Sequence, residues 1–216
     1  MAGVLNMQKG FVFIHVPKCA GASITSALLE SEHSVNFSSL SGLDKIVKEE
    51  NTVSAEVVHL ALHARARDIR RFLGADIYSR LESFAVVRNP WERLRSLYHF
   101  YRGFPPSNPK HEVTRGSLSD FVLWSCENEP NTMHERLTDR SGKVIVNTIL
   151  NFESLESDFQ KISKMLSLNI SGLPVKNKSL NSFEKFSFHR RVIDVVQRTY
   201  ERDFDLFKYP FDPPDG

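Results

Sequence analysis

The stretch "FVFIHVPKCAGASI", from Phe11 to Ile24, constrains the fold of this chain more than any other. Residues 11–15 are β-branched, aromatic or apolar with no amphipathic gap, which predicts a short buried strand. A proline, a lysine and several small residues follow. Residues 23–30 then place Ile24, Ala27 and Leu28 at helical spacing. The chain is therefore predicted to open with a strand, a tight loop and a helix.

A loop of this kind presents backbone N–H groups and the positive end of a helix dipole, and both favour an anion. Gly21 lets the backbone approach a ligand closely, and Ala20 and Ala22 add little bulk. Ser23 offers a hydroxyl, and Lys18 adds a point charge. We interpret the loop as an anion site. The alternative is a turn that only joins the strand to the helix.

The order of residues in this loop differs from that of the common nucleotide-binding loop. The Walker A pattern places its lysine directly before a serine or threonine. Here Lys18 precedes Gly21 and lies close to the end of the strand. We expect the same interactions with an anion, made by residues that follow a different order along the loop.

A second strand end carries a second cation. The strand "FAVV" runs into "RNP", and Pro90 suits the first position of a helix. Arg88 lies at this strand tip and Ser96 lies about two turns into the helix. A phosphate over the start of the helix would contact both Arg88 and Ser96. Arg88 can bind it through two parallel hydrogen bonds. The alternatives are a strand-end salt bridge for Arg88 and an ordinary surface position for Ser96.

The remaining pattern alternates strands with helices, which predicts an α/β fold with a mostly parallel central sheet flanked by helices on both faces. We expect a single domain over residues 1–216, with its ligands at the carboxyl ends of the strands. Further strands are expected over 56–60, 84–87 and 144–152, helices over 66–73, 91–101, 117–126, 155–166 and 190–200, and a polar loop over 127–142.

Composition excludes several classes of protein. The net charge of +2 is too small for a general nucleic-acid binder. However, charge is uneven, and four arginines at 65, 67, 70 and 71 leave a local anion site open as an alternative. Cys19 and Cys126 form no C-x-x-C pair, and a reducing compartment fits two such thiols. No signal peptide and no membrane span is recognised, so we expect a cytoplasmic protein.

These stretches together resemble the sulfotransferases that use 3′-phosphoadenosine-5′-phosphosulfate (PAPS), specifically the carbohydrate type of sulfotransferase family 2 that includes heparan sulfate 2-O-sulfotransferase. "FIHVPKCAGASI" resembles the family's 5′-phosphosulfate loop, and "FAVVRNPWERLRSLYHF" its 3′-phosphate motif. "HARARDIRRFLG", "NFESLESDF", "LPVKNKS" and "YERDFDLFKYPF" follow in the family's order. The resemblance covers nearly the whole chain.

The resemblance implies a role for each matching residue. Lys18 would contact the oxygen that bridges sulfate and 5′-phosphate, and Arg88 and Ser96 would bind the 3′-phosphate. A further loop would touch the donor. The implied donor-binding residues are Pro17, Lys18, Cys19, Ala20, Gly21, Ala22, Ser23, Arg88, Ser96, Asn177, Lys178 and Ser179. Two of them depart from the family, which often has threonine at the positions of Cys19 and Ala22. We interpret Cys19 as a small filler rather than a nucleophile.

Sulfuryl transfer is expected to proceed by in-line displacement, with Lys18 stabilising the leaving oxygen and a histidine taking the acceptor's proton. His63 matches the family's histidine-bearing stretch and is the first candidate, followed by His59. Acidic residues of the 127–142 loop are further alternatives. The resemblance implies a reaction that needs no metal.

Two other functions remain open from the sequence. One is a P-loop-like small-molecule kinase, which would need the Walker A order and an acidic residue for magnesium where Arg88 stands. The other is a catalytically silent nucleotide-binding protein. The expected acceptor is a small molecule or an oligosaccharide.

Overall fold

Phe11–Ile14 forms strand β2 in a computed structural model of the chain, as predicted. The structure describes residues 3–30, 34–36, 64–170, 172–174 and 188–214. They divide into two compact units. The sheet unit comprises residues 1–87 and 135–177, and the helical unit comprises residues 88–134 and 178–216.

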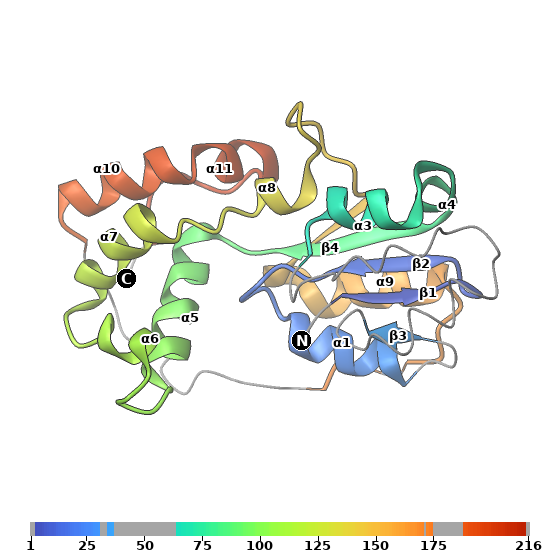
Figure 1. Cartoon of the computed structure of the whole chain (residues 1–216), viewed down its shortest axis with the longest axis horizontal. Coiled ribbons are helices and arrows are strands. Elements are labelled where there is room, and N and C mark those ends of the chain that lie inside the picture. Colours follow the sequence, from blue (N-terminus) through green and yellow to red (C-terminus); the bar gives the residue numbers. More distant parts are fainter. Residues whose placement is uncertain (1–2, 31–33, 37–63, 171, 175–187, 215–216) are drawn as a thin grey trace. The chain divides into compact units, whose positions relative to one another are not determined.

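The sheet unit is built on five described strands in the order β3-β1-β2-β4-β5 (Figure 1). They are β1 Val4–Asn6, β2 Phe11–Ile14, β3 Val35–Asn36, β4 Glu82–Val87 and β5 Thr148–Asn151. β2, β4 and β5 are parallel, with Phe13 opposite Phe84 and Ala85 opposite Ile149, whereas β1 is antiparallel to both its neighbours. The α/β class with a mostly parallel sheet is confirmed.

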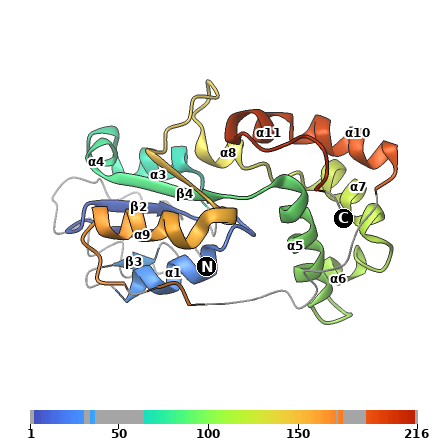
Figure 2. The same ribbon diagram turned by 180° about the vertical axis from the view of Figure 1, so that it is seen from behind.

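Helices surround this sheet. They are α1 Gly21–Leu29, α3 Ala66–Leu73, α4 Ala75–Arg80, α8 His134–Leu137, the 3₁₀ turn η1 Phe152–Ser154 and α9 Leu155–Met165. α9 covers one face of the sheet, since it lies behind β1 and β2 in Figure 1 and in front of them in Figure 2. Its apolar positions recur at helical spacing, and Phe159 and Ile162 are buried.

The helical unit contains α5 Pro90–Arg102, α6 Pro109–Glu112, α7 Leu118–Asn128, α10 Arg190–Thr199 and α11 Glu201–Phe207. Pro90 opens α5 as expected, and the Asn89 side chain caps that helix by accepting from the Trp91 N–H at 2.9 Å. Ser117 caps α7, as predicted. The core of this unit gathers Trp91, Phe121 and the buried faces of α10 and α11.

The prediction of a polar loop over 127–142 is wrong in part. Met133 and Leu137 are fully buried there, α8 forms, and Thr138 pairs with Val144 across an isolated bridge. Two apolar residues isolated among polar ones leave no periodicity, so the sequence pattern did not reveal them. The strand predicted over 56–60 lies outside the described residues.

Within the described ranges, no helix is long and apolar enough to cross a membrane. The expectation of one domain over the whole chain stays a prediction.

Candidate functional site

A loop joins β2 to α1 in the sheet unit, as the sequence predicted, but the helix begins at Gly21, two residues before the predicted start at Ser23. Lys18 and Ala20 both adopt the left-handed conformation, with φ of 67° and 57°. A residue with a Cβ pays on the order of 1 kcal/mol for this conformation, so two such residues within three positions indicate a backbone that its surroundings hold in place. Left-handed residues that alternate with ordinary ones turn backbone N–H groups towards one concavity, a shape that binds anions.

The start of α1 adds to this concavity. Ala20 is the N-cap, so no side chain caps the helix, and no acidic residue occupies its first turn. The Ser23 and Ile24 N–H groups donate to the Ala20 carbonyl at 3.0 and 3.2 Å. The helix therefore directs its positive end at the loop without a carboxylate or cap oxygen of its own to neutralise it.

Gly21 has a packing role that the sequence did not reveal. A Cβ added there would lie 1.9 Å from two atoms of the His15 imidazole, Cδ2 and Nε2. His15 is buried and stacks on Phe13, with ring centroids 6.2 Å apart. Because Gly21 has no side chain, the His15 ring fits directly against the backbone of the loop.

Cys19 is only 1% exposed, and its Sγ donates to the Pro17 carbonyl at 3.6 Å. A thiol so enclosed fills space in the loop, which agrees with the interpretation of Cys19 as a filler. The other cysteine is equally unsuited to reaction, because burial raises the pKa of Cys126 to about 11.

Arg88 begins the helical unit directly after Val87, the last residue of β4. Its guanidinium lies 3.5 Å from a Glu92 carboxylate oxygen and is mostly enclosed. The same oxygen is held more closely by Arg95, at 2.5 Å. Ser96, one turn beyond Glu92 on α5, is partly exposed. The strand-end salt bridge considered from the sequence is therefore present, but the carboxylate is shared between two cations.

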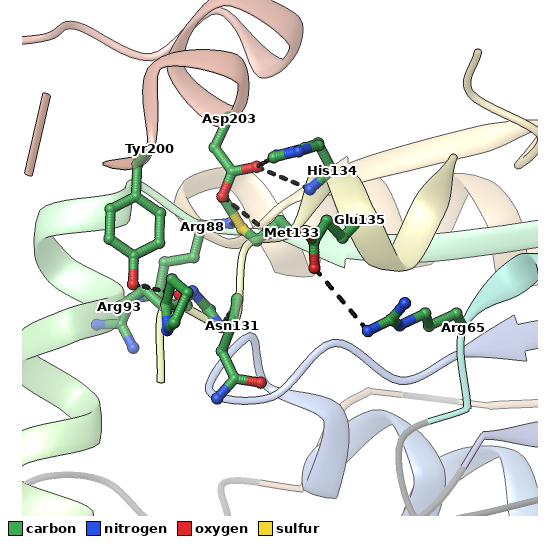
Figure 3. Close-up of polar contacts among 10 residues, drawn as sticks. Arg65, Arg88, Arg93, Asn131, Met133, His134, Glu135, Tyr200 and Asp203 are labelled. Atoms are coloured by element: carbon green, nitrogen blue, oxygen red, sulfur yellow. Dashed lines mark hydrogen bonds and ion pairs between the residues drawn. The ribbon is translucent and has the colours of Figure 1, made fainter. Parts of the chain in front are cut away.

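Three anchors hold the segment 130–134 next to the Arg88 backbone (Figure 3). The Tyr200 hydroxyl donates to the Pro130 carbonyl, and the buried Arg93 guanidinium donates to the Asn131 carbonyl at 2.5 Å. The third anchor is the Asp203 carboxylate of α11, which holds the end of the segment.

Asp203 has no solvent exposure, and three hydrogen bonds satisfy its carboxylate. Its two oxygens accept the N–H of Met133 at 2.8 Å, the N–H of His134 at 2.7 Å and the His134 ring at 2.9 Å. In return, the Met133 sulfur accepts the Arg88 N–H at 3.5 Å. This network fixes the backbone from which the Arg88 side chain extends.

The same network orients an imidazole. When His134 donates its Nδ1 proton to Asp203, the ring's acceptor lone pair lies on Nε2, the tautomer that a general base needs. Sequence reasoning missed both residues. The sequence contained one signal. Asp203 follows Tyr200 by about one helical turn and precedes Phe204, so it falls at a core position of a helix, where a carboxylate needs hydrogen-bond partners.

Five of the predicted site residues fall outside the ranges given above. His59, His63, Asn177, Lys178 and Ser179 lie outside the described residues. Arg65, near the predicted histidine stretch, forms an exposed ion pair with Glu135 at 3.9 Å. An exposed pair of this length contributes little to stability.

In the part of the chain that the structure describes, no three His, Cys, Asp or Glu side chains gather closely enough to hold a metal ion. The metal-independent reaction stays a prediction.

Comparison with known proteins identifies the family. A sequence model of the sulfotransferase family matches residues 4–210, almost the full length of the chain. None of the curated proteins matches the chain.

Proposed function

The chain belongs to the sulfotransferase family, and from this premise we propose that it moves the sulfuryl group of PAPS to a hydroxyl of a carbohydrate or glycosylated acceptor. The observation that carries the proposal is the Pro17–Ser23 loop, with two left-handed residues and an uncapped helix beside a lysine. That arrangement fits an anionic group whose leaving oxygen needs a nearby positive charge.

The loop residues of the sheet unit would hold the 5′ end of the donor. Backbone N–H groups of Ala20, Gly21 and Ala22 at the start of α1, with the Ser23 hydroxyl, would surround the 5′-phosphate. Lys18 would stabilise the charge that develops on the bridging oxygen as its bond to sulfur breaks. When bound, PAPS supplies an activated sulfuryl group whose transfer needs positioning and charge stabilisation above all.

Residues of the helical unit would hold the 3′-phosphate. Arg88 offers a guanidinium suited to two parallel hydrogen bonds with a phosphate, and Ser96 offers a hydroxyl. The Asp203 network supports this role, since it fixes the Arg88 backbone through Met133. Asn177, Lys178 and Ser179 are proposed as a further donor-contacting loop on the family resemblance alone.

A histidine would take the acceptor's proton as the new oxygen–sulfur bond forms. We retain His63 as the first candidate and His59 as the second. His134 joins them, because Asp203 already holds its ring in the tautomer of a base.

We propose that the acceptor is a carbohydrate hydroxyl, as in the 2-O-sulfating type of the family. We also propose that the protein is cytoplasmic. A magnesium-dependent kinase would need the Walker A order that this loop lacks.

Transfer of ³⁵S from labelled donor to a panel of saccharides, in EDTA, tests the proposal. We expect an acceptor-dependent labelled product, identified by mass spectrometry as a sulfate ester. Lys18→Ala should abolish transfer, whereas Lys9→Ala, a lysine of the same unit that donates to the Ser167 carbonyl, should leave it intact. Normal transfer by the Lys18 variant would show that this lysine has no catalytic role.

A further inference from the structure

An arginine-lined groove lies in the sheet unit, apart from the loop that holds Lys18. It has a volume of about 750 Å³, within the range of small-ligand sites. Residues of α3 and the start of α4 line it, together with residues 139–141 of the turn before β5. Its four guanidinium groups belong to Arg67, Arg70, Arg71 and Arg140.

Three of these arginines share one face of α3. Arg67, Arg70 and Arg71 stand at positions i, i+3 and i+4, whereas Ala66 and Ile69 are buried on the other side. Like charges at these spacings destabilise a helix. The helix dipole compensates for cations in the last turn, but it disfavours Arg67 in the first turn. The stripe is therefore not explained by the stability of α3.

The two carboxylates that line the groove, Asp68 and Asp139, offset only part of the charge of the four arginines. Asp68 caps its own helix by accepting the Arg65 N–H at 3.3 Å. Asp139 accepts the Ser141 hydroxyl at 2.6 Å and two backbone N–H groups of its turn. Hydrogen bonding from Ser141 keeps the pKa of Asp139 below its ordinary value. Among the described residues, no carboxylate forms an ion pair with any of the four arginines.

The groove is separate from the Lys18 loop. It extends from α3 to the residues that lead into β4 and β5, where a smaller hollow of about 330 Å³ shares Arg70, Ala75 and Ile145 with it. The groove lies at the end of the sheet where the parallel strands begin, whereas the Lys18 loop follows the end of β2. A strand of six residues such as β4 is roughly 20 Å long, and this length separates the two ends of the sheet.

The lining also restricts the chemistry of the ligand. None of the described residues that line the larger groove is aromatic, so they offer no ring on which a nucleotide base would stack. Tyr78 lines the smaller hollow, but it is only 5% exposed and its hydroxyl donates to the Ile145 carbonyl at 3.0 Å, so its ring offers little open face. Several guanidinium groups without aromatic partners fit a compact ligand with several tetrahedral oxyanion groups.

We propose that this groove binds a ligand carrying two or more sulfate or phosphate ester groups, at a site distinct from the Lys18 loop. The shared chemistry is a tetrahedral oxyanion held by paired guanidinium N–H groups. Its source is either a sulfated saccharide or a phosphorylated compound. The proposal holds whether or not the chain transfers sulfate.

Isothermal titration of the full chain in 150 mM salt tests the proposal with two probes, sucrose octasulfate and inorganic tripolyphosphate. We expect saturable binding of at least one probe, and the probe that binds more tightly identifies the source. Arg70→Gln/Arg71→Gln should weaken binding tenfold or more, since each hydrogen bond to a charged group contributes substantially. The matched control is Arg80→Gln, on the exposed surface of α4, which should bind as the unaltered chain does. Circular dichroism verifies that each variant is folded.

Lys18→Ala distinguishes this site from the anion loop and should retain probe binding. The proposal is overturned if neither probe binds, or if the double arginine variant binds as well as Arg80→Gln. Loss of probe binding in Lys18→Ala with retention in the double variant would also overturn it, because the probe would then occupy the anion loop.

Discussion

Replacing Gly21 by alanine tests the packing of the anion loop. The new Cβ would lie 1.9 Å from the His15 ring, whereas ordinary contact begins at 3.4 Å, so the ring must move by about 1.5 Å. His15 is 7% exposed and stacked on Phe13, which leaves it little space. Overpacking of this kind costs about 1–3 kcal/mol. At roughly 2–4 °C per kcal/mol for a chain of this size, we expect a melting temperature lower by about 2–12 °C.

A double-mutant cycle with His15→Ala isolates the contact. If the imidazole is what excludes a side chain at Gly21, His15→Ala removes the clash, and the two destabilisations are less than additive by about 1–3 kcal/mol. Denaturant unfolding of the four proteins, followed by far-UV circular dichroism, measures this coupling. Effects that add to within about 0.5 kcal/mol would refute the packing argument.

Three further predictions concern other residues. Asp203→Asn should lower the midpoint of unfolding markedly, because it removes the charge from a buried carboxylate that accepts three hydrogen bonds; an unchanged midpoint in a thermal melt would contradict this. Ser154→Ala should raise the pKa of Asp158, which the Ser154 hydroxyl and then a lysine hold below its ordinary value. That carboxylate contributes stability above its unfolded pKa and loses it as pH falls through the lower folded pKa, so an NMR titration in which the variant's pKa is unchanged would refute the cause. His63→Ala should reduce turnover far more than donor affinity, whereas His59→Ala should change turnover less; steady-state kinetics with calorimetry decides, and a loss of binding alone would exclude His63 as the base.

Much of the fold could be predicted because its elements have strong local patterns. The run of β-branched and aromatic residues before Pro17 predicted β2, and "RNPW" predicted both the end of β4 and the start of α5. The helical periodicity of α9 gave its position to within a residue or two. In each case a hydrophobic period or a proline, which the chain displays locally, determined the structure.

Elements that depend on distant partners were not predictable. β1 has three residues and is defined by its pairing with β2 and β3. α8 rests on Leu137, a single buried apolar side chain in a polar stretch.

The candidate site follows the same division. The position of Lys18 between a strand and a helix was evident from sequence, as was that of Arg88 after a strand. The left-handed backbone at Ala20 was not, because alanine gives no local signal for that conformation. The pairing of His134 with Asp203 joins residues 69 positions apart, and a single sequence contains no information about such a contact.

The central claim is that the chain binds a nucleotide phosphorylated at both the 5′ and the 3′ position. Calorimetric titration in EDTA with 3′-phosphoadenosine-5′-phosphate and with adenosine 5′-phosphate tests it most directly. We predict that the 3′-phosphate raises affinity roughly 150-fold or more, as two charged hydrogen bonds of about 1.5 kcal/mol each would, and that Arg88→Ala removes this gain. Arg115→Ala, an exposed position of the same unit, should keep it. Equal affinity of the unaltered chain for the two nucleotides would contradict the account.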